Sequence, residues 1–360
     1  MKKIKKKLPK LLIKANSRIK SPFSAYICVA MNLPLQYGID VILQQSAAYK
    51  YQRIALVTNN AAITSTAELS RVALLKNGFN ITTIFSPEHG ITTTGDDGAF
   101  QQNITDTVTG LPVISLYGNR LAPTPEDLQN IDLVLFDIPD VGCRFYTYLW
   151  TMTHVMEACA VSQKPFVVLD RPNPIGADLS KAEGPFLDEQ ACSSFIGRWN
   201  IPIKHCCTLG ELALYFTATK ISRLHIDIIK VQHYNRTQTA LHDFFFTPSS
   251  PAIQNIQTAL FYPGTGLLEG INIDEGRGTL KPFQQCGAPW INAKELQQLL
   301  QQKNLPGLSV TATSYTARAG QYANKTCYGV ELHISNEKEF MAVQTGIVLL
   351  QCIQQLYPQH

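Results

Sequence analysis

Short apolar runs alternate with stretches of helical periodicity from residue 53 to about residue 231, and this alternation constrains the fold more than any other feature. RIALVTN (53–59), DLVLFDIPDVG (132–142) and PFVVLDRPNPIG (165–176) have the apolar, β-branched composition of buried strands. Strands that alternate with helices form right-handed βαβ units and a mostly parallel sheet. The sequence therefore predicts an α/β fold with a Rossmann-like sheet.

The pattern changes after about residue 245, which predicts a second, smaller domain. Before that point, further strands are expected at 81–90, 112–118 and 225–231, and helices at 64–76, from 124, at 144–161 and from a capping box at Thr208 and Glu211. After it, we expect Gly- and Pro-rich loops over 247–290, helices near 293–303 and 338–356, and strands near 309–317 and 328–335. The predicted organisation is a basic leader (1–37), a Rossmann-like catalytic domain (38–245) and a smaller α+β domain completing a cleft (246–360).

The positive charge of the chain is concentrated in the leader. Residues 1–20 hold nine of the 31 Lys and Arg, and the first acidic residue is Asp40. The whole chain is +4, but residues 40–360 carry 22 cations against 27 anions, a net −5. This distribution excludes a broadly basic nucleic-acid binder. The leader has two interpretations: a secretory signal or anchor, or a disordered tail that contacts anionic lipid weakly.

Neither a metal nor a nucleotide cofactor is expected. The nine cysteines have no regular spacing and form no CxxC pair, which argues against a disulfide framework and a structural zinc site. A metal site built from Glu88, His89, Asp137 and His205 lacks any HExxH-like spacing. No GxGxxG follows the first strand, which disfavours a dinucleotide site.

Polar residues collect where the predicted strands end. In open α/β sheets, ligands bind beyond the carboxyl ends of the strands. A single such residue is more often a cap or turn former, but the set as a whole indicates a ligand site. Its members are Asn59, Asn60, Glu88, His89, Tyr117, Asp137, Asp140, Arg144, Asp170, Arg171 and Asn173.

A second cluster lies in EGINIDEGRGT (269–279), where charged residues stand among three glycines. Several carboxylates and arginines around one crevice suit sugar chemistry, because glycoside cleavage needs a carboxylic acid and often a second carboxylate. Glu88 is the best acid candidate, since it follows an apolar strand that favours its desolvation. The cluster contributes Glu269, Asn272, Glu275 and Arg277 as further candidates.

Long, ordered strings carry a resemblance to a known family. The strings include LVTNN (56–60), FSPEHG (85–90), TGLPVISLYG (109–118), IDLVLFDIPDVGCRFYTYLWTM (131–152), VVLDRPNPIGA (167–177), AEGP (182–185), HCCTLGELA (205–213), LFYPGTGLLEGINIDEGRGT (260–279) and GAPW (287–290). Together they resemble the exo-β-N-acetylmuramidases of glycoside hydrolase family 171, from about residue 38 to the end of the chain.

The resemblance implies release of N-acetylmuramic acid from the non-reducing end of peptidoglycan fragments, in a cleft between the two domains. It implies Glu88 as the catalytic residue, with His89 tuning it or binding sugar. The second carboxylate is left open among Glu183, Glu211, Glu269 and Glu275, with Glu269 and Glu275 preferred. An arginine is expected to pair with the lactyl carboxylate of muramic acid, the candidates being Arg144, Arg171 and Arg277. The family strings also add Tyr146, Glu183 and His205 as substrate-binding candidates.

Several positions depart from the family pattern. Pro139 stands where Gln is usual, and Cys206 where Gly is usual. Ile271 and Asp274 replace the usual Thr and Ser, and Ser249–Ala252 replaces the usual SPN-MP string. The family pattern also leads us to expect a C-terminal segment beyond His360.

Two alternatives to an active muramidase follow from these departures and from the fold. One is a degenerate homologue that binds muropeptide without cleaving it, and the other is a metal-dependent hydrolase on the same scaffold.

The expected partner is a peptidoglycan-derived saccharide and not nucleic acid, and the sequence does not set the oligomeric state. Related enzymes act on wall fragments outside the cytoplasm, whereas the unpaired cysteines argue for the cytoplasm. Between the two, the cell envelope or periplasm is the expected location.

Overall fold

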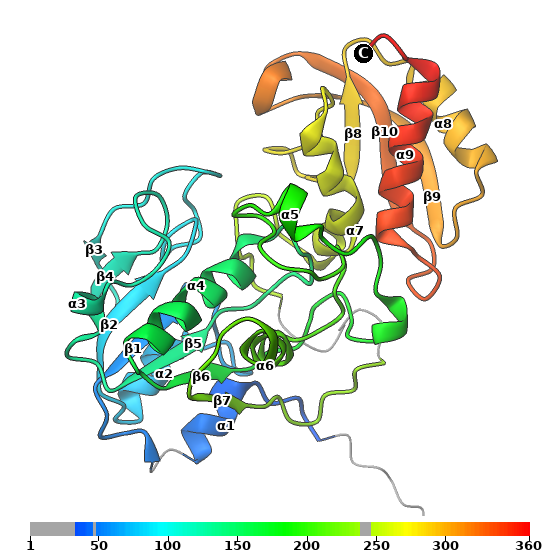
Figure 1. Ribbon diagram of the computed structural model, residues 1–360. Helices are drawn as coiled ribbons and strands as arrows, with labels where there is room; N and C mark the ends of the chain where they lie inside the picture. Colours follow the sequence, from blue (N-terminus) through cyan, green and yellow to red (C-terminus); the bar gives the residue numbers. More distant parts are fainter. Residues whose placement is uncertain (1–32, 46–47, 238–245) are drawn as a thin grey trace, which may run out of the picture. The chain divides into compact units, whose positions relative to one another are not determined.

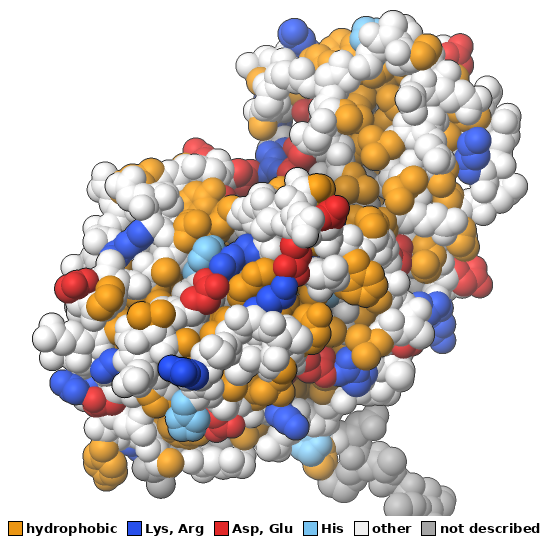
Figure 2. All heavy atoms as spheres, in the orientation of Figure 1, with side chains coloured by type: hydrophobic (Ala, Val, Ile, Leu, Met, Phe, Trp, Pro, Cys, Tyr) orange, Lys and Arg blue, Asp and Glu red, His pale blue; other side chains and the backbone are white. Residues whose placement is uncertain are grey.

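The structure is a computed structural model that describes residues 33–45, 48–237 and 246–360. Most of the predicted leader therefore lies outside the described residues. A parallel sheet and a smaller antiparallel sheet form the framework (Figure 1). Acidic and basic side chains are interspersed over the face drawn in Figure 2. Among the described residues, no helix is long and apolar enough to cross a membrane.

The larger sheet has seven strands in the order β3-β4-β2-β1-β5-β6-β7. All neighbouring pairs are parallel except β3 with β4. The α/β prediction is confirmed. The strands are β1 (Ile54–Thr58), β2 (Ile81–Ser86), β3 (Ile104–Thr105), β4 (Pro112–Ser115), β5 (Leu133–Asp137), β6 (Phe166–Leu169) and β7 (Ile226–Ile229).

Alternate residues of each central strand enter two different cores. On β1, Ile54 and Leu56 pack in the core that includes α1 (Gly38–Gln44) and α2 (Ser70–Lys76). Ala55 and Val57 face the other core, with α4 (Thr147–Val161) and α6 (Leu209–Thr219). Burial on both faces explains why these strands are continuously apolar. Two short helices, α3 (Pro125–Leu128) and α5 (Glu189–Cys192), complete this domain.

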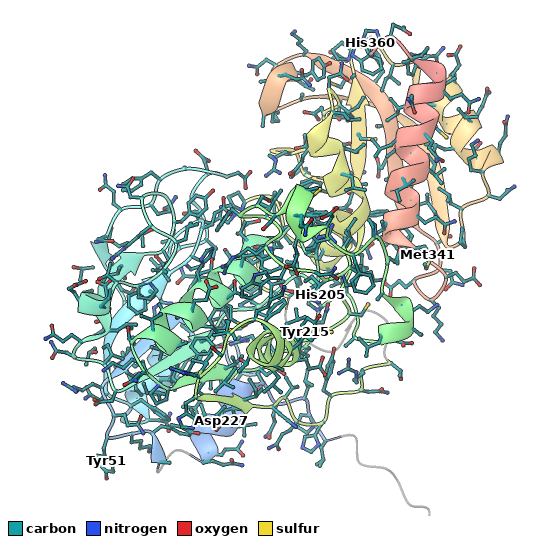
Figure 3. All side chains as sticks on the ribbon, viewed as in Figure 1. Tyr51, His205, Tyr215, Asp227, Met341 and His360 are labelled. Atoms are coloured by element: carbon teal, nitrogen blue, oxygen red, sulfur yellow. The ribbon has the colours of Figure 1, made fainter. Side chains whose placement is uncertain are left out.

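The smaller domain packs three helices on one face of an antiparallel sheet. Its strands, in the order β8-β10-β9, are β8 (Gln285–Ala288), β9 (Leu308–Thr316) and β10 (Thr326–Ile334). Its helices are α7 (Ile256–Thr265), α8 (Ala293–Gln302) and α9 (Ala342–Leu356). Met341 immediately precedes α9 (Figure 3).

Several local predictions are wrong at their boundaries. The helix expected from Thr64 begins at Ser70, because Ala67 takes a left-handed backbone conformation (φ 64°) that ends any helix before it. Residues 247–290 are not all loop: they form α7, the 3₁₀ segment Gly266–Gly270 and β8. Pro263 lies inside α7 and concealed that helix from periodicity arguments. The capping box of Thr208 and Glu211 is confirmed.

Two glycines allow α7 and α9 to cross with their backbones in contact. A Cβ on Gly264 would overlap the carbonyl oxygen of Ala342, and one on Gly346 would overlap the carbonyl oxygen of Gly264. Since backbone atoms are the obstacle, no rotamer change can relieve the overlap.

The close crossing of α7 and α9 predicts that adding one methyl group at Gly264 strongly destabilises the protein. Gly264→Ala should lower the free energy of unfolding by about 3 kcal/mol, because the helices must separate to admit the Cβ. Gly270→Ala is the matched control, since nothing lies within 4 Å of its Cβ position. Urea unfolding followed by circular dichroism measures both, and equal stability of the two variants would contradict the prediction.

Candidate active site

A cavity of about 500 Å³ lies at the carboxyl edge of the parallel sheet. Residues following β2, β4 and β5 line one side of it, including Glu88, Tyr117 and Thr147. Glu269 and Arg277, which follow α7, line another. The cavity therefore brings together the two sequence clusters that were singled out as candidates.

Glu88 is a buried carboxyl group whose two oxygens have different partners. Its side chain follows β2, and the residue is 7% exposed. The backbone N–H of Gly98 donates to Oε1 at 3.0 Å, and the hydroxyl of Thr147 lies 2.7 Å from Oε2. A hydroxyl can donate or accept, so Thr147 can serve Glu88 in either protonation state. Burial, reinforced by a hydrogen bond to Glu88, raises the pKa of Tyr117 to about 12, which keeps its phenol a donor.

His89 lines the cavity, and a hydrogen bond to one ring nitrogen fixes the orientation of its imidazole. Its backbone is left-handed (φ 65°), and its Nδ1 lies 2.8 Å from the carbonyl oxygen of Gly95. A carbonyl only accepts, so Nδ1 carries a hydrogen. Nε2 lies 3.7 Å from the carboxylate of Asp97 and is the nitrogen free to meet a ligand.

Arg277, on the part of the cavity lining that follows α7, contacts three carboxylates. Its Nε donates to Glu275 at 3.0 Å, while its two terminal nitrogens contact Asp97 and Glu269. Burial lowers the pKa of Arg277, but the neighbouring carboxylates outweigh it and hold that pKa above its ordinary value. The guanidinium also lies 5.3 Å from the centre of the Phe283 ring.

Glu269 is the second carboxyl group on the cavity wall. Its side chain is 40% exposed and lines the cavity. Burial raises the pKa of Glu269, and Glu275 and Asp97 add to this, against the opposing effect of Arg277. Glu275 lies behind Arg277 and does not line the cavity.

Aromatic side chains form much of the remaining wall, and sequence reasoning missed most of them. Phe145, Phe195, Tyr262 and Phe283 line the cavity together with the predicted Tyr146. Asp97 and Thr147 were also missed. Asp97 lies in a Gly-Asp-Asp-Gly turn, a signal of close backbone approach that could have been used.

Many predicted strand-end residues have protein partners instead of facing the cavity. Asp137 is fully buried and forms a bidentate pair with Arg171, at 2.6 and 3.0 Å. Asp170 accepts from the hydroxyl of Thr208 and the backbone of Gly210. These carboxylates hold the loops that follow the parallel strands.

A second pair lies beside them. Asp140 contacts Nε2 of His205 at 3.1 Å, and both side chains are buried. Figure 3 labels His205. With Asp137 and His205 engaged in these pairs, the four residues weighed as a metal site do not come together. Among the residues that the structure describes, no group of three or more His, Cys, Asp or Glu could hold a metal ion.

The other candidates also lie outside the cavity lining. Arg144 donates to the backbone carbonyls of Pro185 and Ile201, and Asn173 to that of Cys207. Asn59 caps its own turn by accepting from Ala61. Glu183 bonds to Lys204 and the start of α9, while Asn60 and Asn272 are absent from the cavity wall.

The structure places two of the departures from the family pattern and explains one of them. Pro139 lines a separate small cavity of about 30 Å³, away from Glu88. Cys206 has a left-handed backbone (φ 52°), a conformation that glycine adopts without strain. The glycine usual at this position is therefore explained by the backbone and not by substrate contact.

The fold and cavity define a two-domain α/β protein with a carboxylate-lined site between a parallel and an antiparallel sheet. Residues 54–257 match the family model for the N-terminal domain of the exo-beta-N-acetylmuramidase NamZ, and residues 260–360 match the model for its C-terminal domain. The chain belongs to this family.

Similar proteins of known sequence and structure support the same family assignment. The peptidoglycan beta-N-acetylmuramidase NamZ of Bacillus subtilis (strain 168) is 40% identical over 332 residues, covering 90% of this chain and 78% of that protein. A DUF1343 family protein from Bacteroides fragilis has a TM-score of 0.83 at 32% identity, covering 90% of this chain and 83% of the other. A second from the same organism has a TM-score of 0.66 at 31% identity, covering 84% and 77%.

The pairing of Arg171 with Asp137 predicts a structural role for both. Arg171→Met should lower the free energy of unfolding by about 3 to 5 kcal/mol, because it leaves a buried carboxylate uncompensated. The double variant with Asp137→Leu should recover most of that loss. Urea midpoints provide the measurement, and full stability of the single variant would count against this role.

Proposed function

We propose that this protein is an exo-acting β-N-acetylmuramidase that releases N-acetylmuramic acid from the non-reducing end of peptidoglycan fragments. The observation that carries the proposal is the buried Glu88 carboxyl group in a sugar-sized cavity that it shares with Glu269, in a chain of this family. The catalytic unit is residues 38–245 completed by 246–360.

Glu88 is placed to protonate the glycosidic oxygen. A general acid must reach the leaving oxygen while its other contacts hold it still. Gly98 and Thr147 hold one oxygen each, and Tyr117 donates to the same carboxyl group. His89 offers Nε2 to a sugar hydroxyl from the same side.

Glu269 is the preferred second carboxylate. It lines the cavity, whereas Glu275 is engaged behind Arg277. Glycosidases of both stereochemical classes use a second carboxylate, as nucleophile or as base for water. The aromatic wall supplies apolar surface for the sugar ring.

Leaving-group dependence tests the role of Glu88. Glu88→Gln should reduce kcat/KM at least about a hundredfold on the disaccharide N-acetylmuramyl-N-acetylglucosamine. The loss should be much smaller on a 4-nitrophenyl N-acetylmuraminide, because nitrophenolate leaves without protonation. Glu269→Gln should impair both substrates.

Glu295→Gln, on the exposed side of α8, is the matched control and should retain parent activity. Undiminished activity of Glu88→Gln on both substrates removes Glu88 from this role. A parent protein that binds the disaccharide in calorimetry but cleaves neither substrate supports the non-cleaving homologue instead.

Arg277 is the arginine proposed to meet the lactyl carboxylate, since Arg144 and Arg171 are engaged elsewhere. With its three carboxylates ionised, its cluster has one positive and three negative charges, a net −2. A further carboxylate must therefore displace one of them. Asp97 is the partner it replaces, being the most exposed of the three at 44%.

Substrate selectivity tests this role of Arg277. Arg277→Gln should lower the ratio of kcat/KM for muramic over glucosamine 4-nitrophenyl glycosides by about tenfold, the value of one charge-assisted contact. Arg144→Gln is the comparison variant, because its guanidinium binds backbone carbonyls outside the cavity. An equal loss of kcat/KM on both glycosides would contradict this role and would mean that Arg277 only positions Glu269 and Glu275.

A further inference from the structure

A second depression of about 700 Å³ adjoins the cavity on the smaller domain. Gln285, Thr313, Tyr315 and Glu331 form its floor, on the face of the antiparallel sheet opposite to the one that helices cover. Its rim includes Lys281 and Arg318. We call this depression the β-face groove.

The β-face groove and the cavity are neighbours along two stretches of chain. Ile253 lines the cavity and Gln254 the groove, and likewise Arg277 lines the cavity and Gly278 the groove. Consecutive Cα atoms are about 3.8 Å apart. On each stretch the two linings therefore meet with no residue between them, and a ligand that fills the cavity can continue into the groove.

The charge of the groove is opposite to that of the cavity. Lys281 pairs with Glu331 across the groove, and the two charges offset each other. Arg318 has no ion pair or hydrogen bond to any residue that the structure describes, and so contributes a free positive charge. The cavity instead holds the carboxyl groups of Glu88, Asp97 and Glu269 against Arg277 alone.

The backbone fixes the base of the Arg318 side chain beside the shared rim. Gly278 is left-handed (φ 76°), and a Cβ there would lie 2.9 Å from the Cβ of Arg318. The loop therefore packs directly against Arg318. This contact places the base of the exposed Arg318 side chain next to the point where the two depressions meet, and the guanidinium extends from there.

We propose that the β-face groove binds the leaving part of a long substrate, with Arg318 pairing to a carboxylate on it. This inference rests on the proposed function, because only a chain cleaved in the cavity has a leaving part to bind. In a peptidoglycan fragment that carboxylate belongs either to the lactyl group of the next muramic acid or to its stem peptide. A chromogenic glycoside and a disaccharide end before either group.

Chain-length dependence tests the inference. For Arg318→Ala, the ratio of kcat/KM for a muramic-terminated tetrasaccharide to that for the disaccharide should fall about tenfold, through KM. Arg318→Lys should restore part of that ratio, because it keeps the charge. Arg223→Ala, an exposed arginine between α6 and β7, is the matched control and should not change the ratio.

Three tetrasaccharides separate the two carboxylate sources: one with a free lactyl group, one with that group amidated, and one carrying a stem peptide. Sensitivity to Arg318→Ala with the first and not the second assigns the lactyl group, and sensitivity only with the third assigns the peptide. An unchanged ratio with all three overturns the inference while disaccharide cleavage leaves the proposed function intact. If the parent protein is inactive on every substrate, the proposed function is wrong, which is a different outcome from a failure of the groove inference alone.

Discussion

The buried carboxylate of Glu183 joins the two domains, and the geometry of the cavity depends on that joint. Its oxygens accept from Lys204 in the larger domain and from the first backbone N–H groups of α9 in the smaller one. A carboxylate at a helix N-terminus meets both unpaired donors and the positive end of the helix dipole. Because α9 crosses α7, and α7 leads into Glu269, this one side chain helps to set where the second carboxyl group stands relative to Glu88.

The sequence was sufficient for the fold and for the edge on which the site lies. Runs of β-branched residues located β1, β5 and β6, and polar residues at strand ends located the carboxyl edge. It was not sufficient to decide which of those residues face a ligand. Asp137, Asp170 and Arg171 resemble Glu88 in position, but a parallel sheet buried on both faces also needs partners for the backbone and charges of its loops. Only the tertiary contacts show whether such a residue faces a ligand or pairs with groups in the loops.

Aromatic residues and backbone strain were the other obstacles to prediction. Phe145 and Tyr262 were not singled out from the sequence, because aromatic residues are common in hydrophobic cores. In the structure their rings pack against each other while lining the cavity. Cys206 illustrates the reverse case: a departure from the family pattern that looked chemical is a matter of φ. A non-glycine residue in the left-handed region costs about 1–2 kcal/mol, which the surrounding loop must offset.

The crossing of α7 and α9 also restricts how the site can move. Helices that pack through side chains can slide past one another by small shear displacements. Backbone contact at Gly264 and Gly346 leaves no such freedom, so the two helices form one rigid unit. Any widening or narrowing of the cavity must then carry Glu269 and Arg277 together, because Glu269 follows α7 and Arg277 is paired with Glu269. The distance from Glu88 to Glu269 and Arg277 can change, but Glu269 and Arg277 keep their positions relative to each other.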